Sequence, residues 1–231
     1  ALIGLVVFIH ELGHYIAARL TGTPVETFGV GFGPVLIERV KWGTKWRIGW
    51  IPFGGYVKME LPQDSSRLCK DSAIILAGPF ANLLVTFVCL MSVCLINGLS
   101  LGESVGRVWE VLVLVTNATL NAFGNLLTFT SAEDFQGPVG ILSSTREAIA
   151  GREFHFTHFL ILVGVMSFGL GSINLFPIPP LDGGAFVFLW LRPLAPRFMK
   201  MVELVVRATG ALALIAFMIF VTCKDVIKLF V

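Results

Sequence analysis

The stretch "ALIGLVVFIHELGHYIAARL", residues 1–20, decides the fold class, because it is apolar enough to lie in a lipid bilayer yet carries His10, Glu11 and His14 near its middle. Ionisable side chains at bilayer depth are costly, so they usually face a protein interior or a water-filled cavity and mark a functional site. The run has no basic start and no small-residue cleavage site, which argues against a secretory signal peptide. We therefore interpret it as a membrane helix that carries part of a functional site.

The composition extends this interpretation to the whole chain. Of the 231 residues, 55% are hydrophobic and 14% are charged, and the mean hydropathy is +0.84. A helix needs about 20 apolar residues to cross the hydrocarbon core of a bilayer. The sequence therefore predicts an all-α membrane protein with about four transmembrane helices, at residues 1–20, 73–97, 159–181 and 204–223.

Basic residues are spread unevenly over the segments between these helices. Eight of them lie between Arg19 and Lys70 and four lie within 182–207, whereas 98–158 carries three basic and six acidic residues. Membrane loops with an excess of lysine and arginine stay in the cytoplasm. We therefore expect a multi-pass protein whose first and third connections face the cytoplasm, together with the functional site, while 98–158 faces outward.

The letters HELGH at residues 10–14 form a metal-binding pattern. Positions i and i+4 share one face of a helix, so His10 and His14 can each direct a ring nitrogen at the same zinc ion, with Glu11 beside it. In a chain of this length the pattern arises by chance with a probability of roughly a few per cent. The alternative is a pair of histidines held by hydrogen bonds in a helix bundle, where buried polar groups also join helices.

A catalytic zinc site needs a third protein ligand and an open fourth position for water. The best candidate is Asp182 in "INLFPIPPLDGG", residues 173–184, where prolines must break the third predicted helix. Asp182 is then expected on irregular backbone at membrane depth, which is tolerated only when it is buried in protein or lines a cavity. A second interpretation, compatible with the first, makes Asp182 the cap of a short helix that begins at residue 183.

Five segments together, in chain order, carry a family resemblance: HELGH, IPFGGYVKM, LAGPFAN, GPVGI and NLFPIPPLDGG. They resemble the site-2 protease family of intramembrane zinc metalloproteases, and in particular its bacterial branch of regulator-of-sigma-E proteases. The resemblance covers almost the whole chain. It implies that His10, His14 and Asp182 bind zinc and that Glu11 is the catalytic base.

The resemblance also implies a setting and a substrate. Asn174 and the prolines after it, Pro177 among them, match a segment associated with the active centre and with accommodation of the substrate. The expected enzyme lies in the bacterial inner membrane and cleaves transmembrane segments of single-span proteins, such as anti-sigma factors or signal-peptide remnants. The expected partners are therefore these substrates and the lipid bilayer, and we expect no nucleic acid.

Residues 22–60 are predicted to form a small membrane-associated β insertion between the first two helices. Two β-type runs are joined by a turn at Gly43-Thr44, and a third short run follows Gly54-Gly55. Tryptophans at its apolar tips suit the membrane interface. An exposed strand edge could hold an unwound substrate extended, so we expect Ile48 and Trp50 to contact the substrate. The alternative is an ordinary hairpin in solvent.

The sequence divides into three parts. Residues 1–97 hold the first two membrane helices and the β insertion, 98–158 form an outward amphipathic helix and loop, and 159–231 hold the last two membrane helices. The apolar stripe of the amphipathic helix is expected to contain Val105, Val108, Trp109, Leu112 and Val115. Members of the resembled branch carry PDZ domains where 98–158 lies, and this segment is too short and too poor in core residues for them. We expect the PDZ part to be absent, either naturally or by removal, and several residues to be missing before residue 1.

We therefore predict a zinc endopeptidase that acts inside the membrane. The other hypothesis is a metal-binding membrane transporter or an inactive homologue, in which the two histidines and Asp182 hold an ion without hydrolysis. Glu11 distinguishes the two, because a transporter has no need of a carboxylate next to the first ligand. The identity of the substrate, the bond that is cut and the oligomeric state do not follow from the sequence.

Overall fold

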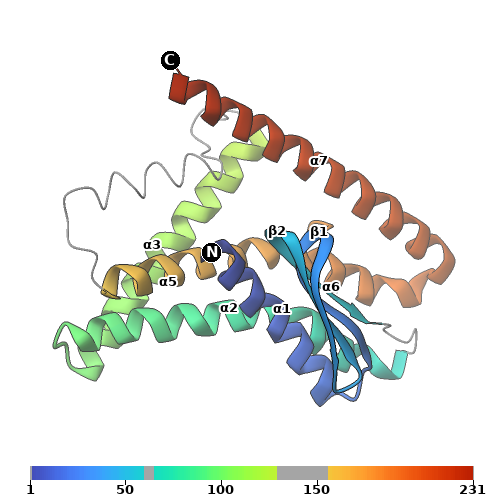
Figure 1. The fold of residues 1–231 in the computed structure, drawn as a ribbon, viewed down its shortest axis with the longest axis horizontal. Coiled ribbons are helices and arrows are strands. Elements are labelled where there is room, and N and C mark those ends of the chain that lie inside the picture. The colour runs from blue at the N-terminus through green and yellow to red at the C-terminus, as the bar shows by residue number, and fades with distance from the viewer. Residues whose placement is uncertain (1, 60–64, 129–155, 231) are drawn as a thin grey trace.

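A computed structural model of the chain describes residues 2–59, 65–128 and 156–230 (Figure 1). The GPVGI segment at 137–141 and the loop predicted after the outward helix lie outside these residues. The described chain is mostly helical with one small sheet, as the sequence predicts. Its elements are α1 (Leu2–Leu20), β1 (Val25–Lys41), β2 (Thr44–Met59), η1 (Ser65–Arg67), α2 (Leu68–Ile96), α3 (Leu101–Thr128), α5 (Phe156–Asn174), α6 (Asp182–Leu191), η2 (Arg192–Leu194) and α7 (Pro196–Phe230).

Three helices in the described part are long and apolar enough to cross a membrane, namely α1, α2 and α5. They correspond to the first three predicted spans. The fourth predicted span, 204–223, is helical as part of α7, but it is not one of the three. The count of four spans therefore remains a prediction.

The third helix ends earlier than expected, and this changes the place of Asp182. α5 ends at Asn174 instead of residue 181, because the prolines that follow lack the backbone donor that a helix needs. Asp182 is the first residue of α6, so it does not lie on irregular backbone as predicted. It is not the cap either, since Leu181 occupies that position and no side chain caps the helix.

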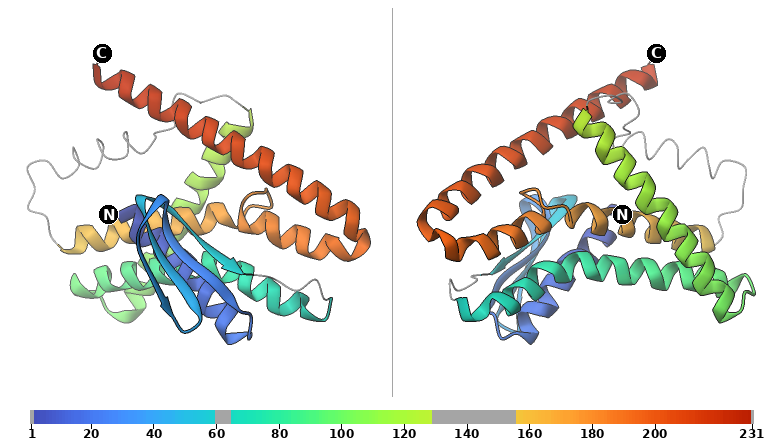
Figure 2. Two further views of the ribbon diagram at one scale, coloured as in Figure 1. Left: turned by 45° about the vertical axis from the view of Figure 1, so that its right-hand side comes forward. Right: turned by 180° about the vertical axis from the view of Figure 1, so that it is seen from behind.

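The helix α2 is the centre of the bundle, with α1 and α5 packed along it (Figures 1 and 2). Glycines allow both contacts. A Cβ atom added to Gly13 of α1 would lie 2.9 Å from the carbonyl carbon of Ala77, and one added to Gly171 of α5 would lie 3.0 Å from the carbonyl oxygen of Pro79. Both helices therefore reach the backbone of the same turn of α2.

The sheet packs against α1 and differs in detail from the predicted hairpin. Lys41 pairs with Thr44, so the turn is centred on Trp42-Gly43, one residue before the predicted position, and both of these residues have positive φ angles. Residues 27–30 of β1 are paired with 55–58 on one side and with 45–48 on the other. Residues 27–30 are therefore a central segment of the sheet, with one segment of β2 on either side.

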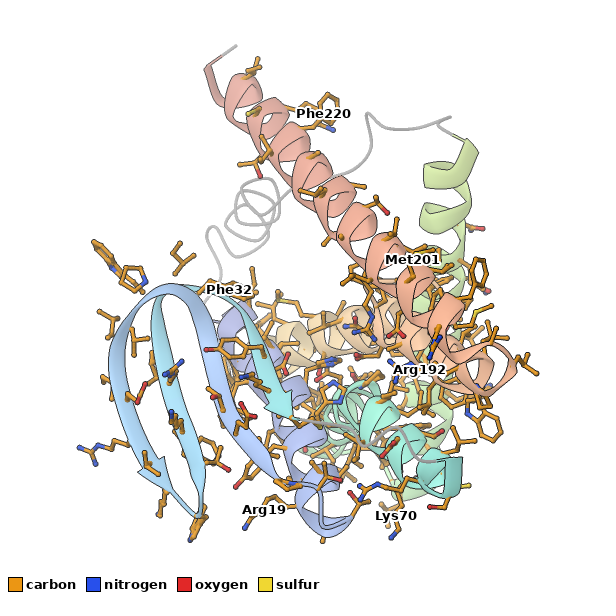
Figure 3. All side chains as sticks on the ribbon, turned by 90° about the vertical axis from the view of Figure 1, so that its right-hand side faces the viewer. Arg19, Phe32, Lys70, Arg192, Met201 and Phe220 are labelled. Atoms are coloured by element: carbon orange, nitrogen blue, oxygen red, sulfur yellow. The ribbon has the colours of Figure 1, made fainter. Side chains whose placement is uncertain are left out.

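The two ends of the sheet have different surroundings. At the inner end, Val25 and Phe28 are buried in a core with Tyr15, Ala18 and Ile74. The outer end exposes apolar side chains, and Figure 3 shows Phe32 at the end of the sheet remote from Arg19. The exposed apolar residues away from the turn are Phe32, Val35, Leu36, Ile37, Ile48, Trp50 and Ile51. Val40 and Trp42 are also exposed, but they lie at the turn beside Val25, whose carbonyl accepts a hydrogen bond from Thr44.

The predicted amphipathic helix between the second and third spans exists as α3, but its buried stripe is displaced. Val108 is buried with Leu90 and Cys94 of α2. Val105 and Trp109, which we expected on the same stripe, are 52% and 68% exposed. The helix is rotated so that its small Ser104 faces inward instead.

Candidate metal centre

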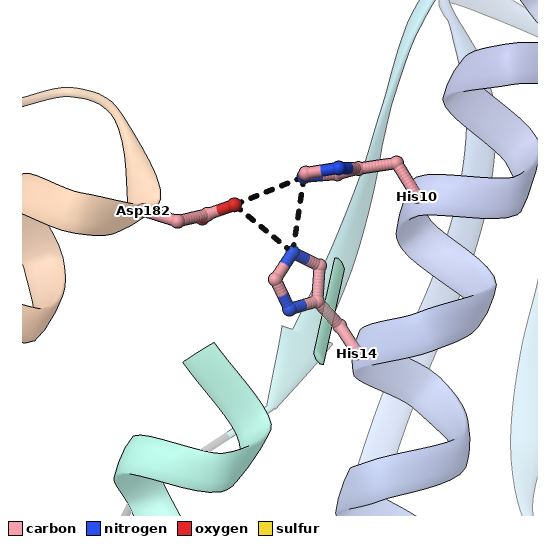
Figure 4. Close-up of side chains that lie close together, drawn as sticks. All are labelled: His10, His14 and Asp182. Atoms are coloured by element: carbon pink, nitrogen blue, oxygen red, sulfur yellow. Dashed lines mark hydrogen bonds and ion pairs between the residues drawn. The ribbon is translucent and has the colours of Figure 1, made fainter. Parts of the chain in front are cut away.

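Three predicted ligands from distant parts of the chain meet at one point (Figure 4). His10 and His14 project from α1, and Asp182 projects from the start of α6. The Oδ2 atom of Asp182 lies 2.9 Å from Nε2 of His10 and 3.4 Å from Nε2 of His14. The two Nε2 atoms are 3.2 Å apart.

These separations fit a tetrahedral zinc ion. Ligand atoms about 2.0–2.1 Å from zinc in a tetrahedral arrangement are about 3.3–3.4 Å from one another. The three observed separations of 2.9, 3.2 and 3.4 Å are close to that value. Two imidazoles and one carboxylate leave one of four positions open, which is the arrangement of catalytic zinc sites rather than closed structural ones.

A backbone carbonyl of α2 sets the tautomer of His14. Its Nδ1 atom lies 2.8 Å from the carbonyl oxygen of Ile74. A carbonyl oxygen accepts hydrogen bonds and cannot donate them, so Nδ1 carries the proton and Nε2 of the neutral ring keeps its lone pair. Metal-binding histidines commonly donate their second nitrogen in this way, which fixes the orientation of the ring.

The part of α2 that makes this contact possible lies in LAGPFAN, residues 76–82, which contributes to the family resemblance but had no predicted role in the site. A Cβ atom at Gly78 would overlap the ring of His14, lying 2.6 Å from Cε1. Pro79 follows inside the helix. Because proline has no N–H, the carbonyl of Ile75 lacks its usual helical donor. Ile75 is one of the residues that line the cavity beside the ligands. The detectable signal was the pair Gly-Pro within an apolar helix, because a membrane helix tolerates such a break where other groups satisfy the backbone.

A cavity of about 440 Å³ opens beside the three ligands. Glu11 lines it, as do Gly54 and Gly55 of β2. A Cβ atom at Gly55 would lie 2.8 Å from Cγ of Glu11. β2 therefore passes directly against the predicted base, and the cavity lies between this strand and the ligands.

The four residues predicted to bind the substrate are scattered. Asn174 lines the cavity and donates from Nδ2 to the carbonyl of Leu170 at 3.0 Å. Pro177 is exposed in the connection between α5 and α6. Ile48 pairs with β1 residues on two sides, and Trp50 is 69% exposed. Pro177, Ile48 and Trp50 are not among the residues that line the metal cavity.

One wall of the cavity comes from α7 through Arg207. Arg207 forms an ion pair of 3.0 Å with Glu203, whose side chain is buried. Arg192 of η2, labelled in Figure 3, donates to the same carboxylate from Nη2 at 2.8 Å. Two arginines share one acid, so this cluster carries a net positive charge and joins α7 to the end of α6.

The residues of this site lie within the part of the chain that matches a known protein family. The family model described as peptidase family M50 matches residues 1–217. A putative zinc metalloprotease of Campylobacter jejuni is 46% identical over 100 residues, which cover 37% of this chain and 27% of that protein. The regulator of sigma E protease of Haemophilus influenzae is 40% identical over 94 residues, covering 35% of this chain and 21% of that protein.

A putative zinc metalloprotease of Fusobacterium nucleatum aligns more fully, at 24% identity over 333 residues that cover 99% of this chain and 97% of that protein. The aligned length exceeds the 231 residues of this chain, so that relative contains residues without a counterpart here. In the two more identical alignments the chain covers less than a third of the relative's length.

Proposed function

Because the chain belongs to peptidase family M50, we propose that it hydrolyses peptide bonds inside the transmembrane segments of other membrane proteins. Membership confirms the family inferred from the motifs, and zinc is the metal named for its relatives. The observation that carries the proposal is the meeting of His10, His14 and Asp182 beside a cavity lined by Glu11. Two of these ligands and Glu11 belong to α1, which is apolar enough to cross a membrane.

The metal ligands and Glu11 have different roles in the proposed reaction. His10, His14 and Asp182 would hold the zinc ion, which when bound supplies the Lewis acidity that activates water and polarises the scissile carbonyl at neutral pH. Glu11 accepts the proton of the attacking water and returns it to the leaving amine, as a general base and then a general acid. The cavity admits the water and the peptide to these groups.

The proposed place for the substrate is the edge of β2 nearest the ligands. In the described part of the chain, residues 55–59 are paired with β1 on one side, and Val57 and Met59 line the metal cavity with Gly55. An extended segment that adds to a strand edge binds through its backbone groups. Ile48 already has β1 partners on both sides, so we propose that Ile48 and Trp50 contact the substrate or lipid farther from the metal.

A helical substrate must unwind before it can lie along this edge. Glycine or proline near the scissile bond lowers the cost of unwinding by about 1 kcal/mol or more per residue. Substrates carrying such residues should therefore be cleaved faster than a matched substrate with alanine there. Equal rates for the two would contradict binding in the extended form.

We also propose that the protein lies in a bacterial inner membrane with its active site toward the cytoplasm. The support is the bacterial origin of the relatives and the excess of basic residues between Arg19 and Lys70. In a background without native cysteines, a cysteine at position 45 should resist an impermeant reagent added from outside. Labelling at that position would place the site on the other side.

The decisive experiment separates a peptidase from a metal-binding transporter or inactive homologue. The purified protein is assayed for zinc content and for cleavage of a single-span reporter in lipid, together with Glu11→Gln, which keeps the shape of the side chain and removes the base. We expect cleavage to fall by about 10²-fold or more while zinc remains bound.

The matched control is Glu26→Gln, which removes a carboxylate that pairs with the exposed Lys58 of the sheet. This variant should cleave at the wild-type rate. Undiminished cleavage by Glu11→Gln would exclude Glu11 as the base. A wild-type protein that binds zinc and cleaves no single-span substrate would instead favour the transporter or inactive homologue.

A further inference from the structure

Asn82 of α2 lies against the side of His10 that faces away from the proposed metal position. The asparagine side chain is fully buried, and its amide group is 3.4 Å from Nδ1 of His10. The other nitrogen of that ring, Nε2, faces His14 and Asp182. Asn82 therefore touches a proposed ligand without taking a place among the ligands.

The hydrogen bonding of Asn82 is incomplete when its nitrogen faces the histidine. In that orientation Oδ1 is buried and has no partner in the described part of the chain, which is unfavourable for an amide oxygen. The amide nitrogen only donates, so Nδ1 of His10 would have to accept and the proton of the neutral ring would sit on Nε2. That proton would point at Nε2 of His14, 3.2 Å away.

Turning the amide of Asn82 by half a rotation gives His10 the tautomer that a metal ligand needs, and places the amide nitrogen where Oδ1 had no partner. Oδ1 then accepts the proton of His10 Nδ1, and Nε2 keeps a free lone pair directed at the other two ligand atoms. Amide oxygen and nitrogen have nearly the same shape, so the hydrogen-bond network decides between the two orientations. His10 then matches His14, whose Nδ1 donates to the carbonyl of Ile74.

We propose that Asn82 is a positioning residue whose side-chain oxygen holds His10 in the tautomer and orientation that leaves Nε2 free for the metal. This inference rests on the proposed zinc site. It gives α2 a single role toward both histidines, because residues 74, 78 and 82 are four apart and lie on one face of the helix. Ile74 orients His14, Gly78 makes room for its ring, and Asn82 orients His10.

Asn82 is enclosed by its neighbours. One turn away, α2 and α5 are joined separately by Thr86, whose Oγ1 atom lies 2.9 Å from the carbonyl of Gly164 on α5 and 2.9 Å from the backbone carbonyl of Asn82, so that the two carbonyls share one proton. A Cβ atom on Gly171 of α5 would lie 3.1 Å from Cβ of Asn82. The side chain is therefore enclosed between α1 and α5 and has little freedom to leave His10.

A simpler role for Asn82 is that of a buried polar residue that only joins helices. Thr86→Val provides the matched control, since it removes a buried hydrogen bond between α2 and α5 one turn away without touching His10. If Asn82 only joins helices, Asn82→Leu and Thr86→Val should affect zinc binding equally. If Asn82 positions His10, an acceptor at position 82 should be sufficient, and Asn82→Asp should retain the function.

The test measures zinc affinity by competition with a chelator in purified protein that elutes as a single folded species. We expect Asn82→Leu to weaken zinc binding by about 10–100-fold, which is typical for loss of an outer partner of a ligating histidine. Asn82→Asp should stay within a few-fold of the wild type, and Thr86→Val should be unchanged. If Asn82→Leu does not fold, Asn82→Ala removes the same acceptor with less added bulk.

Wild-type zinc affinity in Asn82→Leu or Asn82→Ala would overturn the inference. Equal weakening in Asn82→Asp and Asn82→Leu would also overturn it, because the acceptor would then not matter. The result is independent of proteolysis: a wild-type protein that binds zinc and cleaves nothing would refute the proposed function while leaving the effect of Asn82 on zinc affinity measurable.

Discussion

Replacing Gly78 by alanine tests whether the close approach of α2 to His14 is needed for metal binding. The new Cβ atom would lie 2.6 Å from Cε1 and 2.8 Å from Cδ2 of His14, whereas ordinary van der Waals contact begins at 3.4 Å. Nε2 of the ring lies nearer still, so the ring or the helix must move by at least about 0.8 Å. Distances between zinc and its ligands tolerate deviations of only about 0.2 Å.

Two opposing effects decide the sign of the change in stability. Alanine in place of glycine favours a helix by roughly 0.5–1 kcal/mol. Insertion of a methyl group into a closely packed site costs typically about 1–3 kcal/mol. We therefore expect a modest loss of stability and a larger loss of zinc binding, because the displacement exceeds the deviation of about 0.2 Å that zinc–ligand distances tolerate. Cleavage should fall by about 10²-fold, as for a displacement of about 1 Å in a reactive group.

The assay compares zinc content, thermal unfolding and cleavage of the reporter for Gly78→Ala and a matched control. Gly169→Ala is a suitable control, since Gly169 lies in the apolar helix α5 and a Cβ atom there would meet nothing within 4 Å. The control should bind zinc and cleave normally. A Gly78→Ala variant with full zinc content and wild-type cleavage would refute the argument that α2 must approach His14 this closely.

Two further substitutions separate the ligand from the base. Asp182→Ala should lower zinc affinity as well as activity, since Asp182 makes no capping hydrogen bond in α6; full zinc content in the folded variant would show that it is not a ligand. Gly55→Ala should slow cleavage while zinc stays bound, because its Cβ atom would lie 2.8 Å from Cγ of Glu11, nearer than its contacts of 3.1 Å with Gly29 and Val7, and so displace the base most. Cleavage of the reporter at the wild-type rate would contradict this.

The sequence located the proposed metal centre because its parts follow from local rules. The spacing of His10 and His14 places them on one helix face, and the prolines before Asp182 end a membrane helix. These two signals need no knowledge of tertiary structure. The structure brings the three side chains together as that reasoning requires.

What the sequence did not disclose depends on contacts between helices. The partner of His14 is a backbone carbonyl at Ile74, and a carbonyl is present at every position, so no residue type marks it. The double pairing of residues 27–30 in the sheet likewise depends on how the two strands bend. For the same reason Ile48 was predicted at a substrate edge, although both of its edges are occupied by β1.

The contacts that glycines of α1 and α5 make with α2 also decide whether lipid or water can reach the proposed metal site. At Gly13 and Gly171 the neighbouring helices approach the backbone of α2 so closely that even one methyl group would overlap or press against it, and an acyl chain, which is wider, cannot pass between them. The cavity is bordered on another side by Gly54 and Gly55 of the sheet. Hydrocarbon is thus excluded along the helix contacts, while the water needed for the proposed hydrolysis can arrive past β2, the strand that is proposed to receive the peptide.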